Sequence, residues 1–163
     1  MSVENLKKFA LKLGQTRNFI TNETVAILNK NEKLIADMNR EQMAKSPGLG
    51  ADGHELGYGY TEMSAYIRES EGLQTDFVDF KHTGDFHKSI FAESYSDGKT
   101  PFIDIDATDY KWTEAKISES KTNPYGLKKQ NPEALGLIEK NRDKVGGIIA
   151  RELSQRISKF WKI

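Results

Sequence analysis

Apolar residues recur at helical spacing along the first third of the chain. The series begins with Leu6, Phe9 and Leu13 and resumes after a short polar break. Apolar positions three or four residues apart line one face of a helix. The pattern predicts a helical region over residues 3–44, formed either by one long helix or by a helix pair.

Glycine and proline end this periodic pattern. Residues 46–61 contain five glycines and one proline, so we expect a glycine-rich loop. No lysine followed by serine or threonine closes the loop, which excludes a phosphate-binding loop of the P-loop type. The segment is interpreted either as a connector or as an ordered element that contacts a partner. Its candidate interface residues are Leu49, Leu56, Tyr58 and Tyr60.

The middle of the chain favours strands. Short runs of aromatic and β-branched residues predict strands at 76–82, 88–96 and 101–105, separated by turns that contain Gly84 and Gly98. Consecutive strands joined by short turns form antiparallel meanders. We therefore expect a small antiparallel sheet of three or four strands within a sheet region at 76–106.

The last part of the chain predicts a loop followed by a long helix. Residues 118–131 contain proline and glycine and are expected to form a loop. Asparagine followed by proline and glutamate at 131–133 is typical of a helix start, and an apolar stripe follows, so a helix is predicted over 132–161. The expectation is a single α+β domain, 1–163, with this helix packed on the sheet.

Composition indicates the kind of compartment in which the chain folds. Its 163 residues include no cysteine, which excludes disulfides and thiolate metal sites. The first residues lack the apolar run of a signal peptide, and no stretch reaches the ~20 apolar residues needed to span a bilayer. We expect a protein that folds in a cytoplasm without contacting a membrane.

Charge is segregated along a chain whose net charge is zero. Residues 1–45 carry eight basic and five acidic side chains, a net charge of +3. Residues 46–80 carry one basic and seven acidic side chains, and residues 140–163 carry seven basic and two acidic ones. The acidic middle and the basic tail are expected to be solvated helix faces or to pair within or between subunits.

Candidate catalytic and metal-binding residues do not form a recognisable site. His82 and His87 are five residues apart, and we expect His87 to face solvent. Asp104 and Asp106 superficially resemble the aspartate motif of haloacid-dehalogenase-type phosphatases, but that motif ends a parallel strand. We expect no catalytic residues, no cofactor and no metal, and no enzymatic activity.

One segment carries a family resemblance. Residues 80–90, Phe-Lys-His-Thr-Gly-Asp-Phe-His-Lys-Ser-Ile, resemble the signature of head–tail joining proteins of tailed bacteriophages, also called neck or tail-completion proteins. The resemblance implies an N-terminal helix, a loop, this signature, a small antiparallel sheet and a C-terminal helix. The residues that match the signature, with Phe86 where leucine is commoner, are Thr83, Gly84, Phe86, Ser89 and Ile90.

The resemblance also implies a function. We expect a virion structural protein, made in the host cytoplasm, that forms a ring of identical copies in the head–tail connector. Its partners would be other neck, portal or tail proteins, with DNA passing nearby in the channel. Two alternatives stay open: a nucleic-acid-binding module that uses the basic last helix, and a small metal-dependent hydrolase. Arg151 and Arg156 are the candidate interface residues on that helix.

Overall fold

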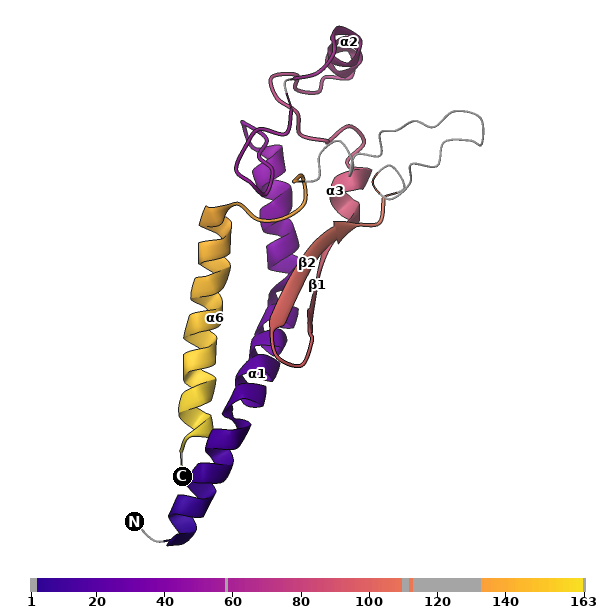
Figure 1. Cartoon of the computed structure of the whole chain (residues 1–163). Coiled ribbons are helices and arrows are strands. Elements are labelled where there is room, and N and C mark those ends of the chain that lie inside the picture. The colour runs from indigo at the N-terminus through magenta and orange to yellow at the C-terminus, as the bar shows by residue number, and fades with distance from the viewer. Residues whose placement is uncertain (1–2, 58, 110–111, 113–132, 163) are drawn as a thin grey trace.

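The computed structural model describes residues 3–57, 59–109, 112 and 133–162. The fold is α+β, as predicted, and the molecule is elongated along its first helix (Figure 1). A two-stranded antiparallel hairpin and a C-terminal helix lie alongside that helix. The elements are α1 (Val3–Ala44), α2 (Glu62–Ser70), α3 (Asp85–Ser89), β1 (Ile90–Ser96), β2 (Pro101–Ala107) and α6 (Glu139–Phe160).

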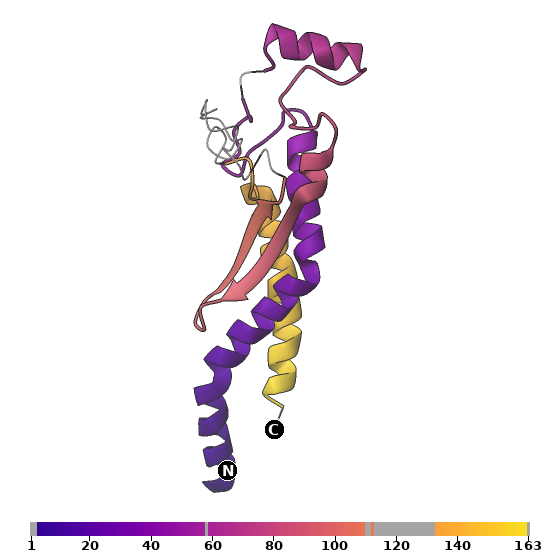
Figure 2. The same ribbon diagram turned by 90° about the vertical axis from the view of Figure 1, so that its right-hand side faces the viewer.

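Helix α1 is a single helix of 42 residues, not a pair, and Figure 2 shows that it bends along its length. Its C-terminal half supplies the centre of the core, where Ile27, Ile35 and Met43 have no exposed surface. Residues from α3, the hairpin and α6 complete this core, among them Phe86, Ile90, Ala92, Ala107 and Val145. Its N-terminal part differs, because Leu6, Phe9 and Leu13 are exposed.

The hairpin follows the predicted second and third strands. Ile90 pairs with Ala107 and Ser96 with Pro101, which places Ile90 and Ala92 on the buried face. Gly98 closes the turn with a φ of 84°, a conformation that glycine adopts without strain. The hairpin tip rests on α1, where the Thr21 hydroxyl donates to the Lys99 carbonyl at 3.1 Å.

The predicted sheet of three or four strands is wrong in its first member, because the described residues form a sheet of only two strands. Residues 76–82 are not a strand, and Phe80 has a positive φ of 51°. The cause is the buried side chain of Asp79, which accepts a hydrogen bond from the Lys81 amide at 2.8 Å and so folds the backbone back on itself. Local side-chain bonding replaces strand pairing here.

Helix α6 begins at Glu139 and not at 132 as predicted. The backbone before it is held by α1: Asn39 donates to the Gly136 carbonyl at 2.7 Å, and Gln42 donates to the same oxygen at 2.7 Å. Gly136 also has a φ of 131°, which is incompatible with a helix. The predicted loop at 118–131 lies outside the described residues.

The main packing partner of α6 is α1 (Figure 1), whereas the sequence predicted packing on the sheet. The rings of Phe19 and Phe160 stack with centroids 4.2 Å apart, and Lys30 pairs with Glu152 at 3.1 Å. None of the helices in the described part of the chain is long and apolar enough to cross a membrane.

Helix α2 was not predicted. It follows the glycine-rich loop, which forms no regular element in its described residues beyond an isolated bridge between Leu49 and Glu55. Thr61 caps the helix by accepting a hydrogen bond from the Ser64 amide at 3.3 Å. Helix α2 lies at the end of the molecule opposite the N-terminus (Figure 1).

Candidate functional site

The segment that carries the family resemblance forms a turn followed by one short helix. Gly84 has a φ of 82° and precedes α3 as its N-cap. The Thr83 hydroxyl donates to the Asp85 carboxylate at 2.7 Å and accepts from the Asp85 amide at 3.4 Å. Ser89 closes the helix by donating to the Phe86 carbonyl at 2.8 Å. The threonine, glycine and serine of the signature therefore shape its backbone.

The two apolar signature residues are buried. Phe86 lies among aromatic rings, with its centroid 5.9 Å from that of Phe80 and 5.6 Å from that of Trp112. Ile90 starts β1 and is 2% exposed. Burying both side chains fixes the start of the hairpin on the core.

A polar cluster centred on the buried Asp79 adjoins the signature. Its members are Tyr60, Arg68, Gln74 and Asp79. Asp79 is 4% exposed and accepts hydrogen bonds from the other three side chains, at 2.8 Å from Tyr60, 3.1 Å from Arg68 and 2.8 Å from Gln74. A buried carboxylate needs such partners, because an isolated charge away from water is costly. The cluster ties α2, through Arg68, to the segment that precedes the signature.

The protonation equilibria of the cluster follow from its burial. Burial alone would raise the pKa of Asp79, but the hydrogen bonds from Gln74, the Lys81 amide and Tyr60, together with the charge of Arg68, hold it below its ordinary value. Burial raises the pKa of Tyr60 to about 12, and its bond to the Asp79 carboxylate acts in the same direction. The cluster is therefore an ion pair with a neutral tyrosine at neutral pH.

His87 and Arg40 join the signature to α1. His87 is buried, which corrects the expectation that it faces solvent, and its Nε2 lies 2.6 Å from the Asp79 carbonyl. Burial lowers the pKa of His87, against the opposing effect of that hydrogen bond. The Arg40 guanidinium donates to the His87 carbonyl at 2.6 Å and also to the Ile90 carbonyl. One side chain of α1 thus holds the end of α3 and the start of β1.

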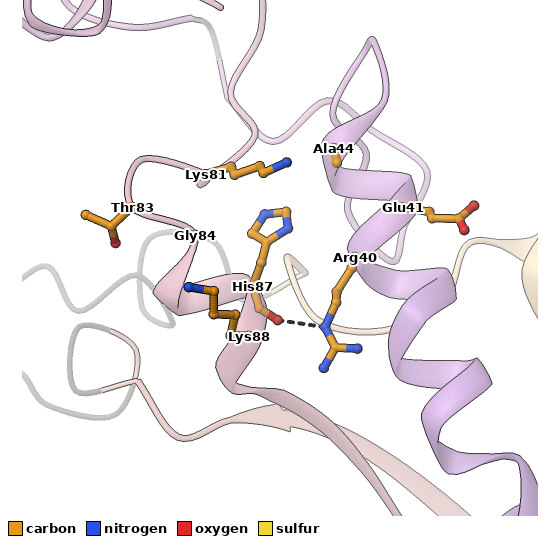
Figure 3. Close-up of a pocket in the computed structure, with 8 residues that line it drawn as sticks. All are labelled: Arg40, Glu41, Ala44, Lys81, Thr83, Gly84, His87 and Lys88. Carbon is orange, nitrogen blue, oxygen red and sulfur yellow. Dashed lines mark hydrogen bonds between the residues drawn. The ribbon is translucent and has the colours of Figure 1, made fainter. Parts of the chain in front are cut away.

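An open groove of about 610 Å³ lies between α1 and the signature turn (Figure 3). Figure 3 shows the side chains of Lys81 and His87 on one side of it and Arg40 on the other. Its cations are Arg40, Lys81 and Lys88, and its lining includes one carboxylate, Glu41. The guanidinium of Arg40 is already bonded to the Asp37 carboxylate and to two backbone carbonyls, so Lys81 and Lys88 are the groove cations least committed to other contacts.

The structure separates the predicted interface residues. Leu56 is in the core, and Tyr60 belongs to the polar cluster. Leu49 is partly buried, and Tyr58 lies outside the described residues. Arg151 is exposed on α6, whereas Arg156 pairs with Glu23 and lies 3.9 Å from Glu152. These residues do not come together in one surface.

The residues considered for catalysis make other contacts. Asp104 accepts a hydrogen bond from the Tyr95 hydroxyl and Asp106 from the Trp112 indole, at 2.8 and 2.7 Å. His82 lies 2.6 Å from a Glu71 carboxylate oxygen. Among the described residues, no group of three or more histidine, aspartate or glutamate side chains is placed to hold a metal ion.

The polar cluster and the role of Arg40 were missed from the sequence. One signal was available, because Asp79 interrupts the apolar run Phe77, Val78 and Phe80. A carboxylate inside a half-buried apolar run requires a buried partner, and only the fold identifies Arg68 as that partner.

Comparisons with family models, with curated proteins and with solved structures found no match to this chain.

Proposed function

We propose that this chain is a structural protein of the head–tail connector, or neck, of a tailed bacteriophage. Copies of it would form a ring that contacts portal and tail components. The proposal starts from the resemblance of residues 80–90 to the family signature. It agrees in element order with the helix, loop, signature, hairpin and final helix of the chain.

The observation that carries the proposal is the structural use of the signature. Its matching residues set a backbone turn and fill the core, and the Ile90 carbonyl accepts a hydrogen bond from Arg40 of α1. A signature used in this way fits a protein whose task is to hold a shape. The hairpin that it positions then presents its outer face to partners.

That outer face carries aromatic side chains together with the exposed carboxylates of Glu93 and Asp104, which lie opposite each other across the two strands. Phe91, Tyr95 and Phe102 are each about 40% exposed on the hairpin, and the rings of Tyr95 and Phe102 stack at 5.4 Å. Exposed apolar patches on soluble proteins mark protein–protein contacts. Aromatic side chains are also enriched at the centre of such contacts. The patch supports an assembly role and gives it a location.

Deleting the coding sequence from a phage that carries it tests the proposal. DNA-filled heads and complete tails should accumulate unjoined, and a plasmid copy of the wild-type chain should restore infectious particles. A plasmid copy with Tyr95→Ser and Phe102→Ser should fold but restore fewer particles. Normal particles from the deletion strain, or absence of the chain from purified virions by mass spectrometry, would refute the neck role.

Nucleic-acid binding is the second candidate, because α6 exposes several cations. Arg142, Lys144 and Arg151 lie on its surface, and the chain segment 140–163 has a net charge of +5. Such binding weakens steeply with salt, in proportion to the number of phosphates contacted. Retention on a DNA column that falls steeply between low and moderate salt would favour this candidate; no retention at low salt would dismiss it.

A further inference from the structure

Two exposed apolar helix faces lie at opposite ends of the molecule (Figure 1). The first is on α2, where Met63, Tyr66 and Ile67 share one side of the helix, and Met63 and Tyr66 are each 70% exposed. The second is on residues 3–13 of α1, which we call the arm. The arm exposes Val3, Leu6, Leu11 and Leu13. Within the described chain, the end of α6 touches the arm through Trp161 at Phe9, whereas Leu6, Leu13 and the α2 side chains stay exposed.

The two faces carry opposite charge. The arm contains Lys7, Lys8 and Lys12 and one acidic residue, Glu4, for a net charge of +2. Residues 62–76, which contain α2 and the turn after it, have four acidic side chains and one basic one, a net charge of −3. The basic residue is Arg68, which is buried against Asp79 and absent from the exposed face. The exposed charged side chains of this segment are thus all acidic.

Helix α2 is anchored to the rest of the molecule by Arg68. Arg68 lies roughly on the opposite side of the helix from Met63 and Tyr66, and it anchors the helix to Asp79 and to the Gln74 carbonyl at 2.8 Å. Its guanidinium also lies over the Tyr60 ring, 4.2 Å from the centroid. The apolar face therefore points outward on a fixed support, which lowers the entropy cost of binding.

A single copy cannot bring these faces together. Helix α1 has 42 residues, so about 60 Å separate its two ends. The arm is at one end, and α2 lies beyond the other (Figure 1). Among the described residues neither face can reach the other, and a second copy of this chain offers a surface of matching chemistry for both.

We propose that the arm of one copy docks on α2 of the next copy. Leu6 and Leu13 would pack against Met63, Tyr66 and Ile67. Lys7 and Lys8 would face Glu62 and Glu69, whereas Lys12 is bonded to the Phe160 carbonyl of its own copy. The contact is heterologous, since each copy uses two different surfaces; such contacts give closed rings or open filaments, depending on the rotation between copies. The inference rests on the proposed ring function and specifies which surfaces build the ring.

Paired variants of the full-length chain test the contact. Leu13→Asp disables the arm, and Tyr66→Asp disables α2; both positions are exposed, so circular dichroism and the unfolding midpoint should stay near the wild-type values. In sedimentation velocity at low salt, wild type should assemble as concentration rises, and each variant alone should associate at least about tenfold more weakly. Leu34→Gln, at an exposed apolar position of α1 outside both surfaces, should behave as wild type.

Mixing the two variants gives the sharpest outcome. The Leu13→Asp chain keeps an intact α2 and the Tyr66→Asp chain keeps an intact arm, so the mixture should form one-to-one heterodimers and nothing larger. Added salt should weaken these heterodimers, because opposite charges face each other. A mixture that stays monomeric, or wild type that stays monomeric at its highest soluble concentration in low salt, overturns the proposed contact.

The proposed contact and the neck role can be refuted independently of each other. Variants that complement the deleted phage normally would refute the contact and leave the neck role standing. Assembly through arm and α2 by a chain that is absent from virions would refute the neck role and leave the contact standing.

Discussion

The two parts of α1 have similar sequence patterns and opposite environments. Leu6, Phe9 and Leu13 repeat at helical spacing in the arm, as Leu28 and Ile35 do further along, yet Leu13 is 59% exposed and Ile35 is fully buried. Both parts are helical. The comparison teaches that periodicity predicts a helix and its apolar face, whereas the partner that covers this face depends on the rest of the chain.

The boundary between the two parts has a structural cause. The hairpin reaches α1 only as far as Thr21, where the Lys99 carbonyl accepts a hydrogen bond from the threonine hydroxyl. On the arm side, the rings of Phe9 and Trp161 lie with their centroids 5.5 Å apart, near the end of α6. Beyond that point the arm continues without a covering element in the described structure (Figure 1).

Truncating one apolar side chain in each part gives the largest expected difference. Ile35→Ala should lower the free energy of unfolding by about 2–5 kcal/mol, since it leaves a cavity in the core. Leu13→Ala should change it by less than about 0.5 kcal/mol, as is usual for surface substitutions. Urea titrations followed by circular dichroism measure both values. Equal losses would mean that the arm is packed in solution.

Glycine substitutions compare the tightly packed loop that follows α1 with the exposed part of α1. A Cβ at Gly48 would lie 2.1 Å from the Val78 carbonyl oxygen, whereas a Cβ at Gly14 has nothing within 4 Å. Gly48→Ala should cost about 1–3 kcal/mol through overpacking. Gly14→Ala, inside the helix, should stabilise it by about 0.4–1 kcal/mol. Thermal unfolding of both variants checks the opposite signs, and a stable Gly48→Ala would contradict the tight contact.

Replacing a polar side chain by alanine also compares the packed part of α1 with the exposed region next to the arm. Asn39 is fully buried and donates to the Ala134 and Gly136 carbonyls, so Asn39→Ala should cost about 1–2 kcal/mol through the loss of these bonds, with Gln42 still bonded to Gly136. Gln15→Ala, at an exposed position next to the arm, is the control and should be nearly neutral. Hydrogen exchange should show faster opening of residues 134–138 in Asn39→Ala. Unchanged exchange there would contradict the role given to Asn39.

The smallest expected effect is a pH dependence of the free energy of unfolding, which arises from His87 in the packed part of the molecule. His87 has a folded pKa below its ordinary value of 6.5, so the unfolded chain binds more protons below that pH. Stability should therefore fall as pH drops through 6.5 toward the folded pKa. His87→Gln should flatten this slope, while His54→Gln, at an exposed position, should leave it unchanged. The charges of Lys81 and Arg40 also lower the pKa of His87, and both residues are unchanged in the two variants.

The sequence predicted what local patterns determine. The long helices follow from apolar stripes, and the hairpin follows from Asp97 and Gly98 between alternating strands, where Asp97 accepts from two turn amides at 2.7 Å. The positive φ at Gly84 was also predictable from its place in a turn. These features need only neighbours along the chain.

What failed depends on distant residues. The predicted strand at 76–82 is lost to the turn in which the Asp79 carboxylate accepts from the Lys81 amide, and Arg68 of α2 is what allows that carboxylate to be buried. The predicted helix start at 132 is lost to Asn39 and Gln42, which lie roughly 95 residues earlier along the chain. The basic groove likewise combines Arg40 with the signature turn. Long-range hydrogen bonds thus override the local helix preference before α6, and the Asp79 turn depends on a charged partner from α2.

The positions of the ends of α1 and α6 determine where a tag or label can be attached to the protein. The N- and C-termini lie at the same end of the molecule, beside the arm (Figure 1). An affinity tag or fluorescent fusion at either terminus would therefore crowd one end only. The hairpin turn at Asp97–Thr100 lies well away from the groove and from α2, so a short epitope inserted there offers a label that leaves both ends of the molecule accessible.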